Sequence, residues 1–127
     1  MSRILIIDDD PAIREISSRI LGRAGHVLEL VKSAEEGLER CAQVRFDLVI
    51  TDLTLPGMNG VKFSELLLQQ HPHTRILIFS GLLTAPDAST TQWASASLGL
   101  RFLAKPFRPK ELLSAVEAVL VEDGTCH

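Results

Sequence analysis

Short runs of consecutive apolar residues alternate along this chain with longer segments in which apolar residues recur every three or four positions. The short runs have the length of β-strands, and the longer segments have the period of amphipathic α-helices. The expected strands are residues 4–7, 27–31, 48–51, 75–79 and 102–103. Apolar strands that alternate with amphipathic helices form a parallel sheet covered on both faces, and right-handed crossovers make that sheet doubly wound. The alternation therefore predicts an α/β domain with a five-stranded parallel sheet.

Local signals mark where several of the expected helices begin and end. Asp10 is an N-cap residue with Pro11 at the first helical position, where the missing N–H costs nothing. Ser33 and Glu36 have the spacing of a capping box, which predicts the start of the second helix. Gly25 is expected to end the first helix. The residues expected on the buried face of the first helix are Ile13, Ile16, Ile20, Leu21 and Ala24.

The length of 127 residues fits one domain, which we expect to cover residues 1–122, with residues 123–127 as a C-terminal tail or the start of a linker. The formal net charge of −3 argues against direct nucleic-acid binding through a basic face. No apolar run is long enough to span a membrane, and the N-terminus lacks the pattern of a signal peptide. We therefore expect a cytoplasmic protein in which Cys41 and Cys126 are reduced thiols.

Acidic, hydroxyl and amine side chains stand directly after four of the expected strands. They are Asp8, Asp9 and Asp10 after the first strand, Asp52 after the third, Ser80 after the fourth and Lys105 after the fifth. The carboxyl ends of parallel strands meet at one edge of a sheet, so we expect these side chains to converge there. Taken singly, each is more often a helix cap, a turn residue or a rim residue, and we expect Asp10 to serve only as a cap. The joint placement is what indicates a site.

A site of this composition favours one kind of chemistry. Asp8, Asp9 and Asp52 carry three negative charges that repel one another, and a hard cation relieves the repulsion. Mg²⁺ prefers oxygen ligands and keeps several waters, so carboxylates and a backbone carbonyl suit it. The metal and Lys105 can bind the oxygens of an incoming phosphoryl group as charge develops. Asp52 is then free to attack that group as the nucleophile.

Four segments of the chain carry recognisable motifs in a fixed order. They are Ile4-Leu5-Ile6-Ile7-Asp8-Asp9-Asp10, Asp52-Leu53-Thr54-Leu55-Pro56-Gly57-Met58-Asn59-Gly60, Ser80-Gly81 and Phe102-Leu103-Ala104-Lys105-Pro106-Phe107. Together they resemble the response-regulator receiver domains of bacterial two-component signalling systems, over about residues 3–121. The resemblance implies a flavodoxin-like (βα)5 fold with strand order 2-1-3-4-5.

The resemblance also implies a role for each site residue. Asp52 is the phospho-acceptor, and Asp8 and Asp9 hold Mg²⁺ together with Asp52 and the backbone carbonyl of Thr54. Lys105 contacts the phosphoryl oxygens. A domain of this family catalyses its own phosphorylation and dephosphorylation and is not a conventional enzyme.

The partners follow from the same resemblance. The phosphoryl donor is a histidine kinase or a histidine phosphotransfer protein, and the exposed rim of the first helix, including Ala12, Ile13 and Arg14, helps to choose that kinase. The Ser80 hydroxyl moves toward the phosphoryl group and Phe102 follows it, so that the Ser80/Phe102 face controls an effector domain or a partner protein.

The sequence departs from the family pattern between the fourth and fifth strands. The gap from Ser80 to Lys105 is a few residues longer than usual, and Leu100 stands where the family has a small residue. The helical signal in residues 82–98 is weak, since this stretch is rich in Ser, Thr and Ala. These departures affect the expected signalling face and leave the expected phosphorylation chemistry untouched.

Three other functions fit parts of the sequence. A haloacid-dehalogenase-type phosphatase would use Asp8 as the nucleophile, with Asp10 completing its Asp-x-Asp pattern, but Ala12 stands where that class has a hydroxyl. A flavodoxin-like FMN-binding module needs a neutral loop after the first strand, whereas this loop is triply acidic. A receiver-like docking module that is not phosphorylated would not need every chemical position to be filled.

Overall fold

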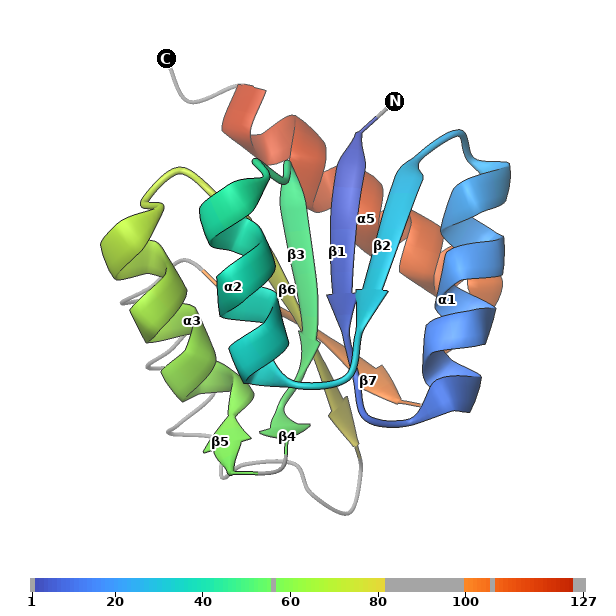
Figure 1. Cartoon of the computed structure of the whole chain (residues 1–127). Coiled ribbons are helices and arrows are strands. Elements are labelled where there is room, and N and C mark those ends of the chain that lie inside the picture. The colour runs from blue at the N-terminus through green and yellow to red at the C-terminus, as the bar shows by residue number, and fades with distance from the viewer. Residues whose placement is uncertain (1, 56, 82–99, 106, 125–127) are drawn as a thin grey trace.

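The computed structural model describes residues 2–55, 57–81, 100–105 and 107–124, and every statement below concerns those residues. Five parallel strands form the sheet shown in Figure 1, and their carboxyl ends all lie at one edge. They are β1 (Arg3–Ile7), β2 (Val27–Val31), β3 (Leu48–Asp52), β6 (Arg75–Gly81) and β7 (Arg101–Lys105). The order across the sheet is β2-β1-β3-β6-β7, which confirms the predicted fold and the predicted order 2-1-3-4-5.

Helices cover both faces of this sheet. They are α1 (Pro11–Arg23), α2 (Ala34–Gln43), α3 (Gly60–Gln70) and α5 (Pro109–Gly124). In Figure 1, α2 and α3 lie in front of the sheet and α5 lies behind it, while α1 packs against α5 and β2. None of the helices in the described part of the chain is long and apolar enough to cross a membrane.

The alternation of side chains along each strand builds two separate hydrophobic clusters. In β1, Leu5 and Ile7 face the cluster on the side of α2 and α3, whereas Ile4 and Ile6 face the cluster on the side of α1 and α5. All four of these side chains are fully buried, and each contributes about 1.5–3 kcal/mol of hydrophobic free energy. Burial on both faces explains why the central strands are continuous apolar runs.

The predicted helix boundaries are confirmed by their hydrogen bonds. The Asp10 carboxylate accepts a bond of 2.9 Å from the Ala12 N–H at the start of α1. The Ser33 hydroxyl accepts a bond of 3.2 Å from the Glu36 N–H at the start of α2. Gly25 follows α1 with a φ of +93°, a conformation that glycine adopts without strain.

The predicted buried face of α1 is wrong at Ile16 and Ala24. Ile16 is 49% exposed, and Ala24 is an exposed cap residue after the helix ends. The fully buried positions of α1 are Ser17 and Leu21, because the face turned to the sheet and α5 is centred between them. A sequence pattern shows an apolar stripe but does not show which edge of the stripe the neighbouring elements cover.

Two further details differ from the simple strand and turn pattern. The turn expected at residues 55–60 is a small antiparallel hairpin of β4 (Thr54–Leu55) and β5 (Met58–Asn59), whose Asn59 then caps α3. Leu100, which stands where the family has a small residue, is buried in the core with 2% of its surface exposed. The weak helical stretch expected at residues 82–98, with the helix of the fourth βα unit, lies outside the described residues, as does Cys126.

Candidate functional site

Three acidic side chains meet at the edge of the sheet where β1 and β3 end. Asp8, Asp9 and Asp52 each offer a carboxylate oxygen, and these oxygens all lie within 4.8 Å of one another. Asp8 is fully buried, Asp52 is half-buried and Asp9 is exposed, so the acid cluster opens to solvent on one side. Asp10 is separate in function because its carboxylate caps α1. The convergence predicted from the strand ends is therefore confirmed for these three acids.

The geometry of this acid cluster fits a small divalent cation. Mg²⁺ binds oxygen ligands at about 2.1 Å in an octahedron, so ligands on opposite sides lie roughly 4.2 Å apart. The carboxylate oxygens of the acid cluster lie up to 4.8 Å apart, so small side-chain movements would bring them to that spacing. Carboxylates are also the ligand type that Mg²⁺ prefers, and an exposed edge leaves room for the waters that it retains.

Backbone and side-chain hydrogen bonds hold Asp8 at the end of β1. The Asp8 N–H donates to the Val31 carbonyl at 3.3 Å, which continues the pairing of β1 with β2. The Asp10 N–H donates to Asp8 Oδ1 at 2.9 Å. A side chain of α1 completes the set, since Arg14 Nη1 donates to the Asp8 carbonyl at 2.5 Å. The bond from Asp10 orients the buried carboxylate and offsets part of the cost of its burial, while the other two bonds fix the Asp8 backbone.

The pairing of the central strand β3 with β6 holds the backbone of Asp52. Its register partner is Phe79 in β6, and the next residue, Leu53, donates its N–H to the Phe79 carbonyl at 2.8 Å. The buried Thr51 hydroxyl donates to the Asp52 carbonyl at 3.1 Å. Phe79 in turn packs against Phe107, with ring centroids 4.8 Å apart. The strand end that carries Asp52 is thus supported from two sides.

The start of α3 approaches the same backbone closely at Gly60. A Cβ atom at Gly60 would lie 2.5 Å from the Asp52 carbonyl oxygen and 3.1 Å from the Leu53 Cα. The Gly60 N–H donates to the Leu53 carbonyl at 2.6 Å. Only glycine fits this approach without displacing Asp52. Gly60 ends the motif that begins at Asp52, but the sequence did not predict its close approach to the Asp52 backbone, because that approach depends on how α3 packs.

Two other predicted site residues lie on β6, which pairs with β3, and on β7, the next strand of the sheet. Ser80 is half-buried and follows Phe79 in β6, with Ala104 as its register partner in β7. Phe102 is half-buried, pairs with Ile78 and packs against the cluster on the side of α2 and α3. Ser80 and Phe102 therefore lie on the same face of the sheet.

Two predicted residues are placed by their backbone alone. Lys105 ends β7 opposite Gly81 of β6, at the same edge of the sheet as the acid cluster. Thr54 begins β4, two residues after Asp52.

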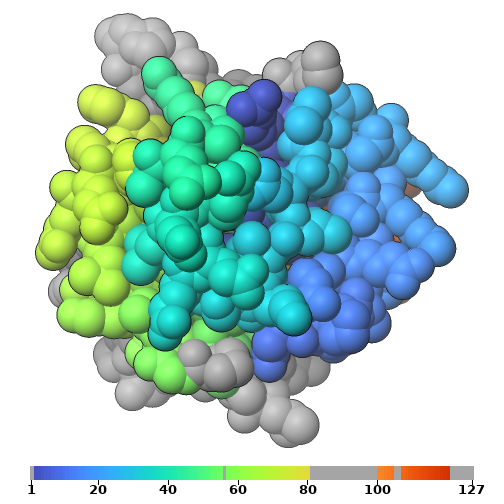
Figure 2. All heavy atoms as spheres, in the orientation of Figure 1, coloured from blue at the N-terminus to red at the C-terminus, as the bar shows by residue number. Residues whose placement is uncertain are grey.

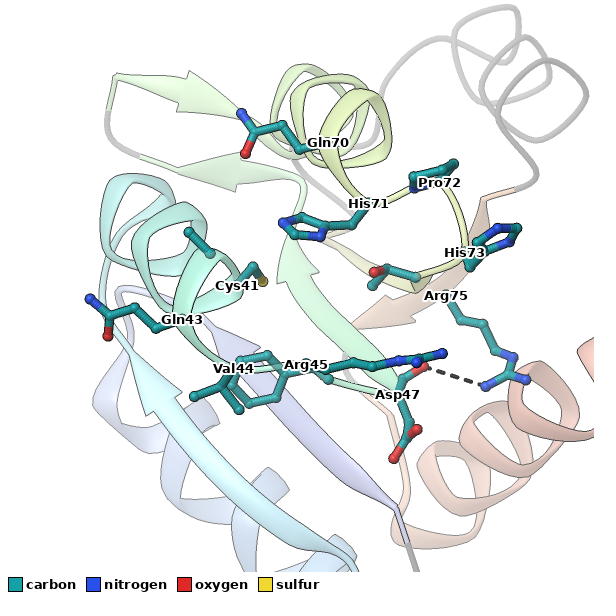
Figure 3. A pocket seen from close by; sticks show the side chains of 13 residues that line it. Cys41, Gln43, Val44, Arg45, Asp47, Gln70, His71, Pro72, His73 and Arg75 are labelled. Carbon is teal, nitrogen blue, oxygen red and sulfur yellow. Dashed lines mark hydrogen bonds between the residues drawn. The ribbon is translucent and has the colours of Figure 1, made fainter.

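A hollow in the described surface lies away from the acid cluster. It has a volume of about 690 Å³ and lies between the ends of α2 and α3, at the opposite edge of the sheet (Figure 3). Arg45 follows α2, and His71 is the C-cap residue of α3. Cys41 lines this hollow, and burial raises the pKa of its thiol to about 11, so the thiol is protonated and unreactive at neutral pH.

Comparison with known proteins agrees with this geometry. The response regulator receiver domain family matches residues 4–117. DNA-binding response regulator MtrA of Mycolicibacterium smegmatis is 32% identical over 123 residues, covering 93% of this chain and 50% of that protein. DNA-binding transcriptional regulator NtrC of Azospirillum brasilense is 35% identical over 118 residues, covering 92% of this chain and 24% of that protein.

Solved structures agree as well. The crystal structure of chemotaxis protein CheY4 of Vibrio cholerae superposes with a TM-score of 0.83 at 31% identity, covering 94% of this chain and 99% of that one. The chain thus spans half or less of the two curated relatives, but it matches nearly the whole of this solved chain.

Proposed function

The chain belongs to the family of response regulator receiver domains, and from this premise we propose that Asp52 accepts a phosphoryl group in an Mg²⁺-dependent reaction. The domain is homologous to phosphorylatable response regulators of two-component systems. The observation that carries the assignment to Asp52 is the acid cluster, in which this residue alone comes from the central strand β3.

The proposed reaction uses the acid cluster in a defined way. Asp8, Asp9 and Asp52, with the Thr54 carbonyl, would hold Mg²⁺, which when bound neutralises charge on the acids and on the phosphoryl oxygens. A carboxylate oxygen of Asp52 forms a bond to phosphorus while the bond from phosphorus to the donor's histidine nitrogen breaks, and the nitrogen keeps the electron pair. Lys105 contacts the phosphoryl oxygens, and the Ser80/Phe102 face responds to the product.

Asp8 is poorly suited to the nucleophilic role that the phosphatase alternative requires. It is fully buried, and its Oδ1 already accepts the Asp10 N–H at 2.9 Å. A nucleophile must be accessible to its substrate, whereas a metal ligand is better held in a fixed orientation. The family match does not favour the phosphatase or the docking-module alternative.

The proposed donor is a histidine kinase or a phosphotransfer protein that docks beside the acid cluster on α1. Ala12 and Ile16 are exposed on this helix, and Figure 2 shows α1 uncovered along one side of the molecule. Ile13 instead packs against the core, and Arg14 is bonded to Asp8. We therefore propose that the kinase contacts Ala12 and Ile16. We also propose that the Ser80/Phe102 face transmits the signal to an effector domain or a partner protein, and that the protein acts in the cytoplasm.

The proposal is tested by labelling with a small phosphodonor in the presence of Mg²⁺. One phosphoryl group should be added, and mass spectrometry of peptides should place it on Asp52. Asp52→Asn should abolish labelling. Asp10→Asn is the matched control, since asparagine also caps helices well and the acid cluster stays complete. Labelling that survived Asp52→Asn and vanished with Asp8→Asn would instead support the phosphatase alternative.

A further inference from the structure

Arg14 makes a contact that differs from its expected role on the exposed rim of α1. Its Nη1 donates a hydrogen bond of 2.5 Å to the main-chain carbonyl of Asp8, and the residue is half-buried. This carbonyl belongs to the peptide that joins Asp8 to Asp9. Both acids of the acid cluster that precede α1 are therefore attached to a peptide held by one guanidinium.

The position of Arg14 is unfavourable unless the side chain has such a partner. It is the fourth residue of α1, near the positive end of the helix dipole, where a positive charge is unfavourable. Arg19 lies further along α1 and represents the ordinary surface arginine of this helix. Its Nη2 pairs with Glu15 at 2.6 Å, and both side chains are mostly exposed.

We propose that Arg14 is a positioning residue of the metal site, which holds the Asp8–Asp9 peptide so that both carboxylates face Asp52. This inference rests on the proposed function. The bond from Asp8 to Val31 fixes the end of β1, and the bond from Asp10 fixes the Asp8 carboxylate. The Arg14 bond fixes the plane of the peptide between the two acids. Groups that orient metal ligands commonly change metal affinity by about 10–100-fold when they are removed.

The charge of Arg14 acts in the opposite direction to its hydrogen bond. A guanidinium near three carboxylates repels an incoming divalent cation, so loss of the charge alone would increase Mg²⁺ affinity. Loss of the hydrogen bond would decrease it, because the peptide between Asp8 and Asp9 could then turn. Arg14→Met removes both the charge and the donor. The direction of the change in affinity therefore shows which effect is larger, and we expect the loss of positioning to dominate.

The experiment measures Mg²⁺ binding by titration calorimetry for the wild-type chain and three variants. Arg14→Met should weaken binding by about tenfold or more. Arg14→Lys keeps a charge and a donor, and its affinity should lie between those of Arg14→Met and the wild type. Arg19→Met is the matched control and should bind as the wild type does. In labelling with a small phosphodonor, Arg14→Met should need more Mg²⁺ for half-maximal rate but reach nearly the wild-type rate at saturation.

Several results would overturn the inference. Binding by Arg14→Met that equals or exceeds that of the wild type would show that positioning by the hydrogen bond does not outweigh the charge of Arg14, which contradicts the inference. Equal weakening in Arg14→Met and Arg19→Met would show a general effect of substitutions on α1 and would contradict a specific role of the Arg14 bond. If Arg14→Met does not fold, as judged by circular dichroism, an Arg14→Lys variant with wild-type affinity and rate would equally contradict positioning by the guanidinium. A wild-type chain that does not bind Mg²⁺ would refute the proposed function itself.

Discussion

Replacing Gly60 by alanine tests whether the approach of α3 to β3 sets the position of Asp52. The new Cβ would lie 2.5 Å from the Asp52 carbonyl oxygen, whereas carbon–oxygen contacts are ordinarily about 3.3–3.6 Å. The two atoms must therefore separate by roughly 0.8 Å or more. Hydrogen bonds restrain the backbone on both sides of this contact, since Thr51 donates to the Asp52 carbonyl and the Gly60 N–H donates to the Leu53 carbonyl.

The expected cost combines two opposing effects. Overpacking of a rigid site costs typically 1–3 kcal/mol. Alanine recovers about 0.4–1 kcal/mol, because it restricts the unfolded chain more than glycine does. We expect Gly60→Ala to lower the free energy of unfolding by roughly 1–2 kcal/mol. We also expect slower labelling of Asp52, by about tenfold or more, since a shift of 1 Å at reacting groups can cost about 100-fold.

Two other glycines serve as matched controls for Gly60→Ala. At Gly22 in α1 a Cβ would meet nothing within 4 Å, so Gly22→Ala should stabilise the domain by about 0.5–1 kcal/mol and leave labelling unchanged. At Gly37 in α2 a Cβ would clash with the Ile7 side chain, which can move, so Gly37→Ala should be less harmful to labelling than Gly60→Ala. Urea unfolding followed by circular dichroism gives the stabilities. A Gly60→Ala variant with wild-type stability and labelling rate would refute the reasoning.

Three further predictions concern other parts of the molecule. Ile16 is 49% exposed on α1, where we propose that the kinase docks, so Ile16→Glu should slow phosphoryl transfer from the cognate kinase but not from a small phosphodonor. Equal slowing of both reactions would instead indicate damage to the site. Burial lowers the pKa of His26 from its ordinary value of 6.5, so the folded chain takes up a proton less readily than the unfolded chain. The free energy of unfolding should therefore decrease as the pH falls from about 6.5 through the lowered pKa, and urea unfolding of His26→Gln should show a weaker dependence if His26 is responsible. Burial raises the pKa of Cys41 to about 11, so alkylation at pH 8 should be slow in the folded protein and much faster in urea, and fast alkylation of the folded chain would contradict this.

The order of the elements and the members of the acid cluster could both be predicted from sequence patterns alone. Continuous apolar runs such as residues 4–7 predict buried strands, since only a sheet covered on both faces buries every side chain of a strand. Asp10 and Ser33 mark helix starts through bonds to residues two or three positions away, so these signals are local in sequence. The meeting of Asp8, Asp9 and Asp52 also followed, because parallel strands end at a common edge whatever their exact packing.

Sequence patterns could not predict which side chains the neighbouring elements cover or which groups come into contact across the fold, because both depend on tertiary packing. Ile16 and Ser17 are adjacent on α1, yet the apolar one is exposed and the polar one is buried, because α5 and the sheet cover one edge of the helix. The bond from Arg14 to Asp8 and the contact of Gly60 with Asp52 depend on where separate elements come to rest against one another. A periodic pattern defines the direction of a side chain around its own helix or strand, but distances of a few ångströms between elements depend on how all the side chains between them pack.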